Sequence, residues 1–204
     1  MHKEVLNQKQ TELLPLLKKF NKDFGLVGGT AIALQLGHRQ SIDFDLFSNK
    51  PIKPSDIRRK IKGVANIDKV LINEKDEYTV IVNGVKITFL FYPFKIKFSK
   101  SLSNIIKLPD LKTLAAMKAY ALGRRAKWKD YVDLYFIMKD KYGIKSVTKK
   151  AKQIFEEEFN EKIFRIQLSY FKDIDYTEKV EYTNDQKTPD SVIKKELKDI
   201  SLKI

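Results

Sequence analysis

Two aspartates, Asp43 and Asp45, are separated by one phenylalanine within an apolar stretch. In a strand from Ile42 to Leu46, side chains alternate between two faces, so both carboxylates point to one face and the three apolar side chains to the other. Neighbouring carboxylates raise each other's pKa unless a cation lies between them, and carboxylate oxygens are usual protein ligands of Mg²⁺. A solvated strand face is the alternative interpretation. The bulky apolar neighbours and the low strand propensity of aspartate favour a metal site.

A glycine turn lies upstream of this pair. Phe24 to Val27 reads as a short buried strand that runs into Gly28 and Gly29, and Thr30 is a suitable N-cap for a helix over residues 31–36. Glycines at such a junction let backbone N–H groups approach a phosphate, and the helix N-terminus adds partial positive charge. A tight turn needs glycine for steric reasons alone, which is the alternative. The nearby aspartates favour a combined nucleotide and magnesium site.

Three more polar residues could contribute to this chemistry. Arg39 and Ser41 directly precede the aspartates and could hold a triphosphate or pair with the carboxylates. Lys118 lies on the apolar face of a predicted helix over residues 111–122. It either extends to the edge of the core or meets a buried anion, and a phosphate is favoured if this helix packs against the glycine turn.

A charged cluster follows on a predicted helix over residues 127–139. Asp130 and Asp133 share one face of that helix, and Lys129 is spaced to pair with Asp133 at i, i+4. A structural ion-pair network and a catalytic or nucleotide-contacting role are both open interpretations.

The elements that must position these residues change character along the chain. The first part alternates strands and helices, and the hairpin signal Asn83-Gly84 indicates an antiparallel segment within a mixed sheet. A basic loop over residues 95–107 leads into a part that reads as helical, so we place the boundary near residue 100. The predicted strands cover residues 67–73, 77–82 and 85–92, the further helices residues 9–20 (beginning or kinked at Pro15), 55–62, 146–158, 162–173 and 191–202, and a poorly anchored connection residues 177–188.

Composition narrows the function classes. The chain has 204 residues, enough apolar content (43%) for a core, and no cysteine, which excludes disulfides, thiolate nucleophiles and Cys-based zinc sites. The net charge of +14 suggests a polyanionic partner, most often nucleic acid; a lysine-rich proteome is the alternative cause. Without an apolar leader or a membrane span, we expect a soluble cytoplasmic protein with no membrane partner.

The two polar blocks together match a known family. Gly28-Gly29-Thr30 with Gly37-His38-Arg39-x-Ser41-x-Asp43-x-Asp45-Leu46-Phe47 closely resembles the AbiEii/AbiGii toxin family of nucleotidyltransferases, within the DNA-polymerase-β-like nucleotidyltransferase superfamily. The block from Lys118-Ala119 through Arg124 or Arg125 to Lys129-Asp130-x-x-Asp133-Leu134 is similar to that family's downstream motif. The resemblance covers roughly residues 10–175.

The resemblance implies an α+β fold, with a nucleotidyltransferase-type mixed sheet, flanking helices and a helical C-terminal part. It implies a nucleotidyltransferase core over residues 1–100 and a helical region over residues 101–204 that completes the active site. It further implies Mg²⁺ (or Mn²⁺) bound by Asp43 and Asp45. The implied catalytic residues are Asp43, Asp45, Lys118 and Asp130, and the implied nucleotide-binding residues are Gly28, Gly29, Thr30, Arg39, Ser41 and Lys129.

The implied activity is metal-dependent transfer of an NMP from an NTP onto an acceptor hydroxyl of an RNA resembling tRNA. Family members act as toxins in toxin–antitoxin or phage-defence pairs, so an antitoxin encoded nearby is an expected partner. A positive surface would hold the RNA by its backbone.

One departure from the superfamily leaves alternatives open. The superfamily usually takes a third carboxylate from a neighbouring strand, but the candidate strand, residues 85–92, contains no acid. Either one metal suffices, or Asp130 or another acid substitutes, or catalysis is impaired. A catalytically degenerate module that binds nucleotide or a protein, and an enzyme that modifies a protein side chain, are therefore the rival hypotheses.

Overall fold

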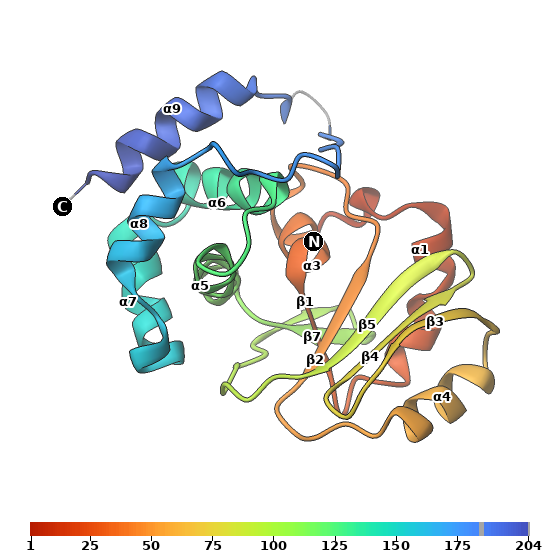
Figure 1. Ribbon diagram of the computed structural model, residues 1–204. Coiled ribbons are helices and arrows are strands. Elements are labelled where there is room, and N and C mark those ends of the chain that lie inside the picture. The colour runs from red at the N-terminus through yellow and green to blue at the C-terminus, as the bar shows by residue number, and fades with distance from the viewer. Residues whose placement is uncertain (184–185, 204) are drawn as a thin grey trace.

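The computed structural model describes residues 1–183 and 186–203. Figure 1 shows a twisted sheet on one side of the molecule and a group of helices, α5 to α9, on the other. The helices are α1 (Gln8–Glu12), α2 (Leu14–Lys18), α3 (Gly28–Leu36), α4 (Pro54–Lys62), α5 (Leu111–Leu122), α6 (Trp128–Asp140), α7 (Ile144–Phe155), α8 (Glu161–Ser169) and α9 (Asp190–Ser201), with 3₁₀ turns at Lys3–Val5 and Glu156–Glu158. The strands are β1 (Gly25–Val27), β2 (Phe44–Ser48), β3 (Ile67–Asn73), β4 (Glu77–Val82), β5 (Val85–Phe91), β6 (Lys100–Leu102) and β7 (Ile106–Leu108).

The sheet is mixed, as the sequence predicts. Its strands lie in the order β3-β4-β5-β2-β1-β7-β6. β2 runs parallel to β5 and β1 parallel to β7, whereas the remaining neighbours are antiparallel. The β4–β5 hairpin turns at Asn83 and Gly84, both with positive φ, which is the geometry that a two-residue hairpin loop requires. The α+β fold class is confirmed.

One face of the sheet packs into the core because its strands alternate. In β2, Phe44 and Leu46 are fully buried while Asp45 is half-buried. In the adjacent β5, the ring of Phe89 lies 4.7 Å from that of Phe20, behind the sheet. This burial fixes the register of the two central strands, since a shift of one residue would turn the polar side chains into the core. The opposite face is left to the polar residues and lines the site.

The helices connect that open face to the second part of the chain. α3 follows β1 directly and packs against both α5 and α6. α5 is in turn covered by α7, and α8 and α9 pack beside them (Figure 1). The sequence favours a phosphate partner for Lys118 if α5 packs against the glycine turn. In the structure, α5 packs on α3, the helix that begins with this turn.

Several local predictions are wrong. The helix after the glycine turn begins at Gly28 rather than Ala31, so Thr30 lies inside it and is not its N-cap. The aspartate strand begins at Phe44, and Ile42 is 53% exposed instead of buried. The basic loop contains β6 and β7, which extend the sheet to residue 108, beyond the boundary placed near residue 100.

The segment after α8 is anchored, contrary to the expectation for residues 177–188, of which 184–185 lie outside the described residues. Tyr182 forms an antiparallel bridge with Arg39. The backbone N–H of Thr183 donates to the carbonyl of His38, and that of Gln40 donates to the carbonyl of Glu181. We call residues 175–183 the strap, because they tie the C-terminal helices to the loop between α3 and β2.

Candidate nucleotide-binding site

The two aspartates lie at the start of β2, on the open face of the sheet and opposite polar residues of β5. Asp45 pairs in register with Thr88, and Asp43, just before β2, accepts an ion-pair contact of 2.7 Å from the Lys86 ammonium. Lys86 and Thr88 alternate with the buried Ile87 along β5. The strand that lacks an acid therefore presents an ammonium and a hydroxyl to the aspartates.

The glycine turn brings backbone against the Asp45 carboxylate. Gly28 has a φ of +71°, and a Cβ built on it would lie 2.1 Å from Asp45 Oδ2. A Cβ on Gly29 would lie 2.6 Å from Arg39 Nη2. Close approach therefore requires glycine at both positions, and the positive φ of Gly28 requires it there a second time. The glycine turn and Asp45 are therefore in direct contact.

Gly28→Ala is expected to destabilise the fold by more than the roughly 1–2 kcal/mol that a left-handed conformation alone costs an L-residue, because the new methyl group would also displace Asp45. A thermal melt measures this loss. Gly63→Ala is the matched control, since Gly63 has a helical φ of −75° and its Cβ would meet no atom closer than 3.7 Å. Equal melting temperatures for the two variants would contradict the close approach.

Burial and repulsion act together on Asp45. Its pKa is raised first by burial and then by the neighbouring Asp43 carboxylate, and the Lys118 and Lys86 ammonium groups offset this only in part. A carboxylate whose ionisation is disfavoured by burial and by a neighbouring carboxylate gains from a bound cation.

The loop before β2 is held by hydrogen bonds that position Asp43. The Thr30 hydroxyl donates to the Asp43 carbonyl and lies 2.9 Å from Ser41 Oγ. The Gln10 side chain donates to the Ser41 carbonyl over 2.8 Å. Thr30 and Ser41 are both buried, so in this structure their hydroxyls support the loop.

A buried ion cluster lies behind the glycine turn. Asp133 accepts two hydrogen bonds from the Arg39 guanidinium, of 2.7 and 2.9 Å, and a third of 2.8 Å from His38 Nε2. The Lys118 ammonium lies 3.1 Å from the same carboxylate and also binds Asp130. Arg39 is therefore paired with Asp133 and not with Asp43 or Asp45.

The charges of this cluster stabilise one another. Burial alone would raise the pKa of Asp133, but the Arg39 and Lys118 cations hold it well below its usual value. Burial would likewise lower the pKa of Lys118, and the Asp130 and Asp133 carboxylates outweigh that effect and raise it. Burial lowers the pKa of His38. At neutral pH the cluster holds ionised Asp133, cationic Arg39 and Lys118, and a neutral histidine.

A cleft of about 430 Å³ connects the turn, Asp45 and α5, and Asp43 borders a separate depression. The cleft includes the sequence-predicted Gly28, Asp45 and Lys118. Further residues on its walls were not predicted as site residues: Phe47, Glu77, Lys86, Thr88, Leu90, Tyr92, Met117 and Tyr120. Arg124 and Arg125, which belong to the downstream motif of the sequence, also line it. The period-2 alternation of β5 could have identified Lys86 and Thr88, because residues that face the same way as Asp45 must alternate with the apolar ones.

Asp130 and Lys129 have partners that differ from those expected. Asp130 binds Lys118 and, over 3.0 Å, Arg125. Lys129 lies 3.3 Å from Glu178 of the strap rather than beside Asp133. Among residues 1–183 and 186–203, no group of three or more His, Cys, Asp or Glu side chains comes together as a possible metal site. Asp130 does not join Asp43 and Asp45 in this structure.

Solved structures share this architecture. MenT4, a nucleotidyltransferase toxin from Mycobacterium tuberculosis H37Rv, superposes with a TM-score of 0.63 at 11% identity, over 95% of this chain and 82% of that one. A candidate nucleotidyltransferase from H. pylori gives a TM-score of 0.60 at 13% identity, over 95% and 91% of the two chains. At these identities the likeness concerns the fold, and the fold is that of the nucleotidyltransferases.

The sequence comparisons identify the family. The pattern of the family described as "Nucleotidyl transferase AbiEii toxin, Type IV TA system" matches residues 85–198. An uncharacterized protein of Aquifex aeolicus (strain VF5) is 31% identical over 175 residues, which is 82% of this chain and 84% of that protein. The chain belongs to the AbiEii nucleotidyltransferase toxin family. No helix among the described residues is long and apolar enough to cross a membrane.

Proposed function

We propose that the chain transfers an NMP from an NTP onto a hydroxyl of an RNA acceptor, and that this transfer is the activity of a toxin. The observation that carries the proposal is the position of Asp45 beside the glycine turn on the wall of a cleft, with Asp43 two residues away in a depression that shares Lys86 with this cleft. The side chain of Lys118 is largely buried, and Lys118 also lines that cleft. Carboxylates, an N-terminal helix turn and an ammonium group are the combination that a metal-bound triphosphate requires.

The two aspartates fit a divalent cation. Their mutual repulsion, visible in the raised pKa of Asp45, is relieved when a cation binds, and Mg²⁺ is commonly held by one or two carboxylates together with substrate phosphates. When bound, Mg²⁺ or Mn²⁺ would neutralise phosphate charge and polarise the phosphate that is attacked. Lys86 already neutralises part of the charge of Asp43, which supports a site with fewer than two ions.

The chain's own residues orient the nucleotide. Gly28, the first residue of α3, lines the cleft, and we assign the backbone N–H groups of Gly28 and Gly29 to the phosphates. Lys118, held by Asp130 and Asp133, adds a fixed positive charge. Arg39, Thr30 and Ser41 are assigned as positioning residues, since their polar groups bind Asp133, the Asp43 backbone and each other.

This assignment gives the second part of the chain a role. Lys118 and Arg125 come from α5 and the loop after it, and both line the cleft whose other wall is the sheet. We therefore propose that residues 101–204 complete a site begun by residues 1–100. Lys129 is retained as a surface cation near Asp43, because the two residues border the same shallow depression with Lys86.

RNA is the acceptor that the charge favours. The net charge of +14 is larger than the binding of one NTP needs. Positively charged protein surfaces bind polyanions such as RNA through the phosphate backbone. The toxin role follows from the family, and an antitoxin is the corresponding partner.

The proposal is tested by incubating the protein with each α-³²P-labelled NTP and a whole-cell extract, with Mg²⁺ or with EDTA. We expect label on RNA in the Mg²⁺ reaction only, together with release of pyrophosphate. Label on protein would instead support the rival in which a side chain is the acceptor.

A non-catalytic nucleotide-binding module is the second candidate, and Lys86 in place of a strand acid is the observation that favours it. NTP binding without label on any macromolecule would support this candidate and contradict the transfer proposal.

A further inference from the structure

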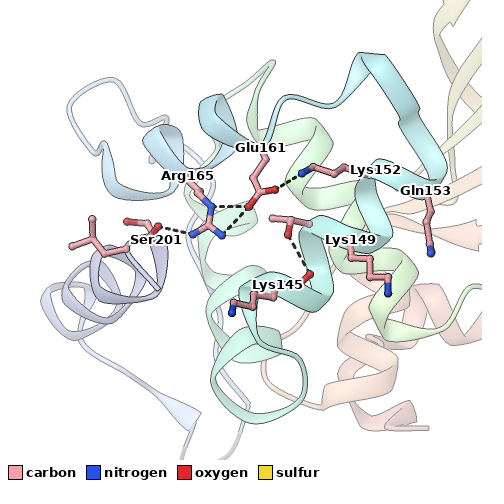
Figure 2. Close-up of a pocket in the computed structure, with 9 residues that line it drawn as sticks. Lys145, Lys149, Lys152, Gln153, Glu161, Arg165 and Ser201 are labelled. Carbon is pink, nitrogen blue, oxygen red and sulfur yellow. Dashed lines mark hydrogen bonds and ion pairs between the residues drawn. The ribbon is translucent and has the colours of Figure 1, made fainter. Parts of the chain in front are cut away.

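A second, larger hollow lies on the helical part of the molecule. It has a volume of about 960 Å³ and is formed by α7, α8 and the end of α9. Figure 2 shows Lys145, Lys149 and Lys152 along α7, with the Lys152 ammonium turned toward Glu161 of α8, which also pairs with Arg165. We call this hollow the α7 groove; its lining residues are Lys145, Thr148, Lys149, Lys152, Gln153, Glu161, Arg165, Ser201 and Leu202.

The α7 groove carries an excess of positive charge. Glu161 is the single acid of the lining, and it already accepts contacts of 2.6 Å from Lys152 and 2.8 Å from Arg165. Arg165 also donates to the carbonyls of Ser201 and Lys203, so it serves the packing of α8 on α9. Lys145 and Lys149 are exposed, and the described part of the chain gives them no carboxylate partner.

The free ammonium groups form a stripe along one helix face. Lys145 and Lys149 are i, i+4 neighbours, and Lys152 and Gln153 continue the same side of α7. The two free ammonium groups, Lys145 and Lys149, are four residues apart, which is about 6 Å along the helix at the rise of 1.5 Å per residue. A row of flexible ammonium groups at this spacing suits consecutive phosphates of a nucleic-acid strand better than a single compact anion.

The opposite face of α7 attaches this stripe to the wall of the cleft. Phe155 of α7 is buried and stacks on Tyr120 of α5, with 4.0 Å between ring centroids and 12° between ring planes. Tyr120 itself lines the cleft, and the Arg124 guanidinium lies 3.6 Å from the centroid of its ring. A nucleic-acid strand bound on α7 is therefore held at a fixed position relative to the cleft.

We propose that the α7 groove binds the phosphate backbone of the RNA acceptor, at nucleotides remote from the hydroxyl that reacts. This inference rests on the proposed function, because that function is what makes the bound RNA a substrate. Recognition there is through backbone charge, so it does not depend on base sequence.

The test compares two charge-reversal variants that each change the net charge equally. Lys145→Glu/Lys149→Glu alters the groove, and Lys69→Glu/Lys75→Glu alters exposed lysines of β3 and the turn after it, at the far edge of the sheet. The probe is dye-labelled unfractionated tRNA without NTP, with Kd measured by fluorescence anisotropy from 50 to 300 mM salt. We expect the groove variant to bind at least about tenfold more weakly at low salt, with a log Kd–log salt slope smaller by about 2.

The outcomes separate the groove from the transfer activity. Equal Kd and slope for the two variants would overturn the groove proposal, even if the wild-type chain labels RNA. Weakening confined to the groove variant would support it, even if no transfer is observed and the proposed function fails. If the wild-type chain does not bind the tRNA probe, the groove proposal is wrong. In transfer assays, the supporting result is a raised KM for RNA with unchanged kcat.

Discussion

Asp45→Asn is expected to abolish nucleotidyl transfer without destabilising the protein. The amide keeps the shape of the side chain but removes the charge that would bind the cation, and loss of one fixed electrostatic group in an active site typically costs about 10²–10³-fold in rate. In the metal-free protein, burial and Asp43 raise the pKa of Asp45 above its unfolded value. Its ionised form therefore opposes folding at neutral pH, and the amide removes that opposition.

The measurement is the initial rate of label transfer from NTP, paired with a thermal melt of the same sample in EDTA. Asp76→Asn is the matched control, because Asp76 is an exposed turn residue and should keep both wild-type rate and melting temperature. If Asp45→Asn transfers label at the wild-type rate, the assignment of Asp45 as a metal ligand is wrong. A lower melting temperature for Asp45→Asn would contradict the electrostatic account of the site.

Asp133→Ala is expected to cause the largest loss of stability among single substitutions in the site. Its carboxylate is fully buried and receives hydrogen bonds from His38 and Arg39 and a contact from Lys118. Removing it leaves two buried cations short of a partner. Breaking a buried pair costs about 3–5 kcal/mol, which for a domain of this size lowers Tm by on the order of 10 °C.

The control is Asp56→Ala, which removes an exposed i, i+3 pair with Arg59 and should change stability by less than about 1 kcal/mol. Acid titration gives an independent check. Because the pKa of Asp133 is lowered well below the ordinary 3.8, its contribution is fully present above pH 3.8 and is lost only as pH falls through the lowered value. Denaturation at several pH values should therefore give a wild-type–variant difference that is constant down to about pH 4. A difference that already shrinks between pH 7 and 5 would contradict the ionised cluster.

Local patterns were enough to predict the elements that carry the site. The strands β3 and β4, the turn at Asn83 and Gly84, and α5 were predicted at their observed bounds, because each depends on a short-range period or a turn residue. The face of Lys118 was predicted for the same reason, and the structure supplies its anions as Asp130 and Asp133.

The contacts that assemble the site depend on long-range pairing that no local pattern reveals. Asp133 is 95 positions from His38 in the sequence, so spacing alone suggested Lys129 as its partner. β6 and β7 were missed since they are short and lysine-containing, and only pairing with β1 makes β7 a strand of the main sheet. The α7 groove is formed by three helices, and the charged residues of each helix alone do not indicate that the three pack together.

The strap has a consequence for the order in which the protein can mature on the ribosome. The loop that positions Asp43 contains Arg39, whose charge partner lies at residue 133 and whose bridge partner lies at residue 182. Domains begin to fold from the N-terminus while synthesis continues, but this loop cannot reach its final state until residue 182 has emerged. A nascent chain stalled before Asp133 would carry Arg39 and Lys118 without their shared carboxylate. The candidate site is thus completed late in synthesis, because its positioning loop depends on residues 133 and 182.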